Sequence, residues 1–243
     1  MQLSHTTVYN HMKKRMQSRI EFVKPPSHPP ISKETKKERL QWAHETQAYN
    51  WDWDRCVFVD ETHFKMGRKG GVKKMWRIKG SDLYRPYLHQ EGQGFTCIIA
   101  FSASKDRPTK MLICKGATKE VYTDFLGKLM SKRKDPIHLM HDNAPGHRAR
   151  LTKKFCKDRG IILVGQPPYS PDTQPVEEVI AWLKGKVYGR NKVYSSIDEL
   201  KKAVEVTWDQ FKDNQSLKLS FARSMPKKIQ RVIDAGGGWP SSS

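Results

Sequence analysis

The sequence predicts an α/β fold in which helices flank a mixed central sheet. Three observations favour this class: short apolar runs typical of strands, amphipathic segments typical of helices, and the alternation of the two along most of the chain. With 243 residues, the chain is long enough for one sizeable domain, or for one domain and a small appendage. No internal repeat is visible.

The N-terminal part is predicted to contain two helices joined by an extended linker. The first covers residues 1–16, with Ser4 or Thr6 as its N-cap. Four prolines in 23-VKPPSHPPIS-32 predict the linker, and a second helix is expected over residues 33–49. We therefore divide the chain into an N-terminal segment, a linker, a main domain and a disordered tail, at residues 1–22, 23–32, 33–235 and 236–243.

The middle of the chain is predicted to supply the strands. They are expected at 56-CVFVD-60, 94-GFTCIIAFSAS-104, 110-KMLICKG-116, 137-IHLMHD-142 and 161-IILV-164. The Gly70-Gly71 pair predicts a turn between two further short strands within residues 67–80. Helices are expected over residues 118–132, 149–158, 196–213 and 219–235, and in a segment that begins near Pro175.

The charge balance favours a polyanionic partner. Lys and Arg number 45 against 25 Asp and Glu, which gives a formal net charge of +20. Nucleic acid is the default partner for such a surplus, and the alternative is a basic surface with no specific partner. The four cysteines show no close pairing, so we expect reduced core thiols. No apolar run approaches a membrane span and no signal peptide is evident, so we expect an intracellular protein.

Two adjacent glutamates begin the helix in 170-SPDTQPVEEVIAWLKGKV-187. At about 100° per residue, one face of this helix is apolar; it comprises Val176, Val179, Ile180, Leu183 and Val187. Glu177 lies at the rim of that face, whereas Glu178 is expected to point to solvent. We therefore expect only Glu177 to lie beside the edge of the sheet.

Asp60 and Asp142 each follow an apolar strand that is predicted to be central. An acid there is costly unless it is paired or binds a metal, and the carboxyl ends of strands are where sites form in open α/β sheets. With Glu177 nearby, three carboxylates would need a cation, and oxygen ligands select Mg²⁺ or Mn²⁺. Two such ions support phosphoryl transfer. Taken singly, each aspartate could instead be a turn or cap residue, and Glu177 a first-turn glutamate stabilised by the helix dipole.

Three blocks of the sequence closely resemble the catalytic core of the mariner-type (Tc/mariner superfamily) transposases: 57-VFVDETHF-64, 141-HDNAPGH-147 and 168-PYSPDTQPVEEVIAWLK-184. These are cut-and-paste DNA transposases with a ribonuclease H-like fold and an Asp, Asp, Asp/Glu metal triad. The resemblance implies that Asp60, Asp142 and Glu177 are the catalytic and metal-binding residues, holding two Mg²⁺ or Mn²⁺ ions. Glu61 and Glu178 would be neighbours of the triad.

The resemblance also implies partners and further site residues. The partner is double-stranded DNA, as transposon ends and target, the full-length family acts as a homodimer, and the expected location is the nucleus. Asn143 and His147 are expected to line the site, with turn hydrogen bonding as the alternative. Phosphate contacts are expected from basic residues: Arg68, Lys69, Lys73, Lys74, Arg77, Lys79 and Lys184.

The chain departs from the family pattern at two places. The turn carries Thr173-Gln174 where Leu-Asn is usual, and Ile180 replaces a frequent Trp. The family also carries two helix-turn-helix units, and this chain begins near the last helix of the second, so we expect an N-terminally truncated transposase. The expected function is metal-dependent DNA cleavage and strand transfer. The alternatives are an inactive DNA-binding remnant and a ribonuclease H-like enzyme that acts on RNA hybrids.

Overall fold

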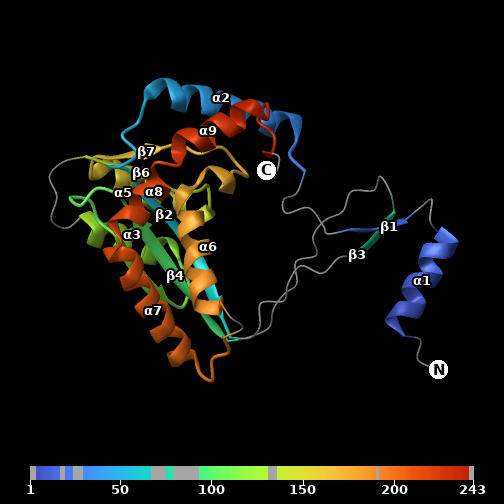
Figure 1. Ribbon diagram of the computed structural model, residues 1–243. Coiled ribbons are helices and arrows are strands. Elements are labelled where there is room, and N and C mark those ends of the chain that lie inside the picture. The colour runs from blue at the N-terminus through green and yellow to red at the C-terminus, as the bar shows by residue number, and fades with distance from the viewer. Residues whose placement is uncertain are drawn as a thin grey trace. The chain divides into compact units, whose positions relative to one another are not determined.

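The computed structural model of the chain (Figure 1) describes residues 4–16, 20–23, 30–66, 75–78, 93–130, 136–189 and 192–240. The chain forms two units. One comprises Met1–Pro30 and Lys69–Glu91, and the other comprises Ile31–Arg68 and Gly92–Ser243. None of the helices in these described ranges is both long and apolar enough to cross a bilayer.

The smaller unit contains helix α1 (His5–Met16) and two paired strands. Ser4 is the N-cap, because its Oγ accepts a hydrogen bond of 3.1 Å from the Thr7 amide. Strand β1 (Ile20–Val23) runs antiparallel to β3 (Met75–Ile78). The partner of β3 is therefore a distant segment, whereas the sequence predicted a partner within residues 67–80. The remainder of that predicted hairpin lies outside the described residues.

The larger unit is built on a five-stranded mixed sheet, as predicted. Its order is β5-β4-β2-β6-β7, with bounds Lys110–Cys114, Gly94–Phe101, Val57–Lys65, Ile137–Met140 and Ile161–Val164. The pairs β2–β4 and β4–β5 are antiparallel, while β2–β6 and β6–β7 are parallel. Strand β2 is thus central and has one neighbour of each kind.

Alternate residues of the sheet face two different helix layers. Phe58, Ile99 and Phe101 pack with the helices that follow the last strand: α6 (Pro175–Tyr188), α7 (Ile197–Asp213), α8 (Gln215–Ala222) and α9 (Met225–Asp234). Val59 and Ile98 pack with α3 (Lys119–Met130) and α5 (Arg150–Asp158). Helix α2 (Lys33–Tyr49) lies against α9 (Figure 1). The sheet is therefore covered on both faces.

Two predicted boundaries near the C-terminus need correction. The single helix predicted over residues 219–235 is two helices, because Pro226 lies in the first turn of α9 and has no amide hydrogen with which to continue α8. The predicted disordered tail is ordered in its described part. There, the carbonyls of Gly237 and Gly238 accept hydrogen bonds from the buried Arg39 side chain.

Candidate active site

Asp60 and Asp142 lie where the parallel pairing of β2 and β6 ends. That pairing aligns Val57 with Leu139 and Phe58 with Met140. Two residues further along the same register, Asp60 comes beside Asp142, on the face of the sheet to which Phe58 also belongs. The sequence predicted that Asp60 ends its strand. Strand β2 instead continues to Lys65, so Asp60 lies within the strand.

Glu177 comes from the first turn of α6, which packs against β2 and β4 on that same face. The five apolar residues predicted to form the buried face of this helix are all buried. Glu178 leaves the helix in another direction. Its carboxylate accepts a hydrogen bond of 3.1 Å from Ser224 Oγ and lies 3.2 Å from Lys228 Nζ. The Glu178 side chain is 38% exposed, in line with the prediction that it points to solvent, but two groups near the start of α9 also bind its carboxylate.

Asp60, Asp142 and Glu177 line one cavity of about 540 Å³. In the part of the chain that the structure describes, no three His, Cys, Asp or Glu side chains form a ready-made set of metal ligands. One oxygen of each aspartate is taken by the protein: Asp60 Oδ1 accepts from the Glu61 amide at 2.7 Å, and Asp142 Oδ1 accepts from the Ala144 amide at 2.9 Å. The three acids thus line one cavity, but their oxygens do not point at a common metal position.

The three carboxyl groups differ in their electrostatics. Burial, followed by the nearby Glu177, raises the pKa of Asp60 to about 8. Burial also raises the pKa of Glu177, against the opposing charge of Lys184. Burial acts in the same direction on Asp142, but hydrogen bonds from His147 and Ala144 outweigh it and lower the pKa of Asp142. Carboxyl groups whose pKa values are pushed apart by burial and by neighbouring charges are typical of functional sites.

Asp60→Asn is expected to stabilise the protein in EDTA by about 1–2 kcal/mol near pH 8, because it removes a buried charge that two other acids repel. The folded-state pKa of Asp60, about 8, exceeds its usual value of 3.8. The wild type therefore loses stability as the pH rises between these values, while the asparagine variant does not. Thermal unfolding from pH 4 to 8.5 should show the two proteins diverging with pH. Parallel curves would contradict the expectation.

His147 lies behind the cavity and does not line it. Its Nδ1 is 2.6 Å from Asp142 Oδ1, and its Nε2 is 2.8 Å from Glu61 Oε1. Ionised carboxylates only accept hydrogen bonds, so both ring nitrogens donate. Burial disfavours the charged ring, but these two bonds outweigh it and raise the pKa of His147 to about 10. His147 therefore joins Glu61, on the opposite face of β2, to Asp142.

The other predicted site residues have mixed outcomes. Asn143 lines the cavity, and its side chain donates a hydrogen bond of 2.6 Å to the Gln166 carbonyl, which belongs to a distant segment and not to its own turn. Lys184 is half-buried, with Nζ 6.0 Å from the centroid of the Phe64 ring. Arg77 lies in β3. The remaining predicted DNA contacts fall outside the described residues: Arg68, Lys69, Lys73, Lys74 and Lys79.

Two residues at the cavity were missed in the sequence. Arg148 is exposed and lines the cavity directly after the 141-HDNAPGH-147 block, a position that could have marked it. Tyr169 also lines the cavity and is 71% exposed. Its position depends on the conformation of a turn, for which the sequence offered no periodic signal.

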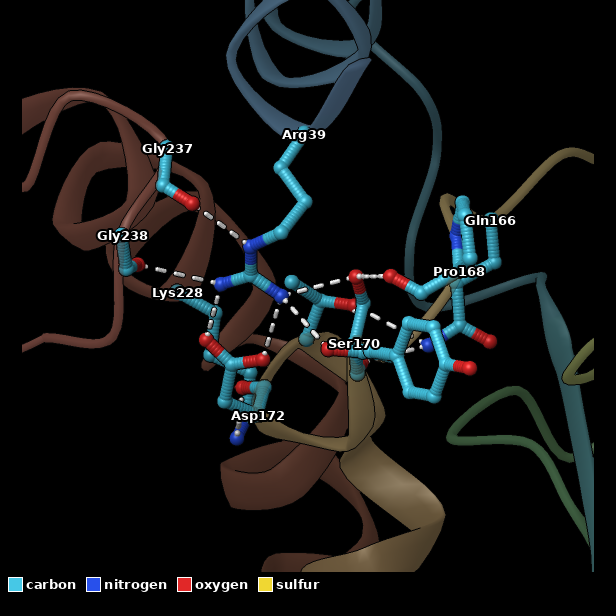
Figure 2. Close-up of polar contacts among 10 residues, drawn as sticks. Arg39, Gln166, Pro168, Ser170, Asp172, Lys228, Gly237 and Gly238 are labelled. Carbon is cyan, nitrogen blue, oxygen red and sulfur yellow. Dashed lines mark hydrogen bonds and ion pairs between the residues drawn. The ribbon is translucent and has the colours of Figure 1, made fainter. Parts of the chain in front are cut away.

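The turn that forms one wall of the cavity is held by Arg39 of α2. Figure 2 shows this side chain between the turn and the C-terminal glycines. Arg39 is fully buried, and its guanidinium donates to both carboxylate oxygens of Asp172, at 2.9 and 2.7 Å. It also donates to Ser170 Oγ at 2.7 Å and to the Gly237 carbonyl at 2.8 Å. Gly237 has a φ of 78°, and a side chain there would collide with the Lys36 carbonyl, so the close approach requires glycine.

Thr173 and Gln174, the two residues of this turn that depart from the family pattern, both form hydrogen bonds with Gln166, which lines the cavity. Gln166 Nε2 lies 3.1 Å from Thr173 Oγ1, and Gln174 Nε2 donates to Gln166 Oε1 at 2.8 Å. Thr173 and Gln174 are buried. Thr173 and Gln174 are therefore connected through the Gln166 side chain, and these hydrogen bonds hold the turn before Glu177.

Comparison with known proteins connects this site to a family. A model of the DDE superfamily endonucleases matches residues 55–201. The Tc3 transposase of Caenorhabditis elegans is 28% identical over 215 residues, which cover 86% of this chain and 64% of that protein. The catalytic domain of Mos1 mariner transposase has the same fold, with a TM-score of 0.68 and 14% identity over 88% of this chain and 99% of that one.

A Mos1 paired-end complex with Mg also matches, with a TM-score of 0.70 and 16% identity over 97% of this chain and 71% of that one. These likenesses confirm the ribonuclease H-like fold and the resemblance to mariner-type transposases. The family model covers more than half of the sequence, including Asp60, Asp142 and Glu177. The chain therefore belongs to the DDE superfamily endonucleases.

Proposed function

We propose that this chain is the catalytic part of a cut-and-paste DNA transposase, which cleaves phosphodiester bonds at the ends of an element and joins them to target DNA. The observation that carries the proposal is the meeting of Asp60, Asp142 and Glu177 at one cavity. The net charge of +20 suits a DNA partner. The chain spans 64% of the Tc3 transposase, so the proposal concerns the catalytic steps.

The donor set at the cavity fits two divalent cations. All three acids offer oxygen ligands, which Mg²⁺ and Mn²⁺ prefer, and the mutual repulsion of Asp60 and Glu177 is a charge excess that cations would neutralise. Mos1 structures with Mg and with Mn support the same choice. Bound ions would supply Lewis-acid activation of water and of the leaving oxygen.

The side chains around the acids would orient the DNA. Arg148, exposed at the cavity, is placed to pair with a phosphate. His147 and the Ala144 amide keep Asp142 ionised and fixed. The predicted phosphate contacts of residues 68–79 and Lys184 remain part of the proposal, as do assembly as a homodimer and action in the nucleus.

Nicking of supercoiled plasmid tests the proposal. The wild-type chain is expected to convert the plasmid to open circles with Mg²⁺ or Mn²⁺ and to leave it intact in EDTA. Asp142→Asn should lose this activity, because the cavity loses an ionised ligand. Asp158→Asn is the matched control, since Asp158 is an exposed aspartate paired with Lys154 on α5. Cutting that persists in EDTA or in Asp142→Asn would contradict the proposal, as would no cutting at all.

A further inference from the structure

Tyr169 presents an aromatic ring at the same cavity as the three acids. It is 71% exposed, more than any other large hydrophobic side chain that the structure describes. Three prolines share this wall of the cavity with it: Pro167, Pro168 and Pro171. Among the described residues, the ring packs into neither of the two core clusters. The packing of the fold therefore gives no reason for an aromatic ring there.

The backbone of Tyr169 is in a disfavoured conformation. Its φ is 51°, and Asn50 is the only other non-glycine residue in the described ranges with a positive φ. Asparagine adopts this region readily, whereas a bulky side chain does so at a cost in free energy. Such strain persists only where the surroundings impose it, and it is found where a side chain must be aimed.

Arg39 is what imposes this conformation. Its Nη1 donates to the Tyr169 carbonyl at 3.2 Å and to Ser170 Oγ at 2.7 Å. On the other side, Gln166 Nε2 donates to the Ser170 carbonyl at 2.6 Å. Figure 2 shows these bonds converging on the turn. A fully buried cation and the Gln166 side chain thus hold the backbone directly after a ring that is itself outside the core.

We propose that the Tyr169 ring stacks on a nucleobase of the DNA strand that is cut at the carboxylate cavity. This inference rests on the proposed function and adds the residue that holds the base. An aromatic face suits any base, because every base has a π-face, and stacking of this kind tolerates sequence variation. A base inside a duplex is already stacked on its neighbours, so the base held by Tyr169 is an unpaired one next to the cut phosphate.

The test uses an oligonucleotide duplex with a short single-stranded overhang that carries 2-aminopurine. Binding is measured in EDTA, so that no strand is cut. The wild type and Tyr169→Phe are expected to quench the fluorescence of 2-aminopurine by stacking on it. Tyr169→Ala should lose the quench and bind the overhang about tenfold more weakly. Tyr49→Ala is the matched control, because Tyr49 is a 63% exposed tyrosine that does not line the cavity.

The outcomes separate this inference from the proposed function. If Tyr169→Ala quenches and binds as the wild type does, or if the wild type does not quench, the stacking role is overturned, even when the plasmid is nicked. If no protein nicks the plasmid but the quench depends on the ring, the stacking role stands and the proposed cleavage fails. Equal quenching by Tyr49→Ala and the wild type shows that the loss is specific to position 169.

Discussion

Glu177→Gln is expected to slow metal-dependent nicking by more than about a hundredfold, whereas Glu178→Gln should cut at nearly the wild-type rate. Loss of a group that merely supports a metal ligand already costs about 10–100-fold, so loss of a ligand should cost more. The two changes are chemically identical and lie in the same helical turn. Only Glu177 lines the cavity, while Glu178 binds Ser224 and Lys228.

Nicking rates and thermal unfolding of the two variants should be measured side by side. Mg²⁺ or Mn²⁺ should raise the melting temperature of the wild type and of Glu178→Gln, because ligands that bind the folded state stabilise it. The same ions should have little effect on Glu177→Gln. If Glu178→Gln loses the cutting and Glu177→Gln keeps it, the assignment of the third acid is wrong.

Arg39→Met is expected to destabilise the fold by about 3–5 kcal/mol, because it leaves Asp172 and several carbonyls without their buried partner. For a chain of this size, the melting temperature should fall by about 10 °C. Arg39→Lys should recover little of the loss, since an ammonium group cannot make the forked contact with both oxygens of Asp172. Urea or thermal unfolding of the three proteins measures the effect.

Arg223→Met provides the control for this prediction. Arg223 also contacts both carboxylate oxygens of an aspartate, Asp54, but its side chain is 65% exposed and that of Arg39 is fully buried. An exposed ion pair contributes less than about 1 kcal/mol. Similar losses in Arg39→Met and Arg223→Met would mean that burial does not set the contribution of the Arg39 contacts.

Local patterns in the sequence were sufficient for the sheet and for the position of Glu177. Apolar runs mark the five strands, although only some of them are deeply buried: β4 is buried along nearly its whole length, whereas β7 leaves Ile162 and Leu163 exposed. The helical period of α6 separates Glu177 from Glu178. The prediction that the three acids meet depended on the order of the strands in the sheet. It assumed that the strands carrying Asp60 and Asp142 are both central. Their roles as metal ligands and catalytic groups stay a prediction until they are tested.

Contacts between distant segments could not be predicted in this way. The pairing of β1 with β3, the bonds from Ser224 and Lys228 to Glu178, and the contact of His147 with Glu61 all join residues far apart in the sequence. None leaves a periodic signal, because each depends on how the elements pack. The split between α8 and α9 is different, since Pro226 was visible and its effect on the helix was overlooked.

The separation of Arg39 from its partners sets an order of events during synthesis. Arg39 lies 133 residues before Asp172 and 198 before Gly237. Contacts between such distant residues close large loops and form late in folding. As the chain leaves the ribosome, Arg39 and the three acids emerge before Gly237 does, so the wall of the cavity is still incomplete when all three acids are present. Completion of the site therefore requires residues 237 and 238. A ribosome-bound chain that stops short of them would hold the acids beside a turn whose partner, Arg39, still lacks its two carbonyl acceptors.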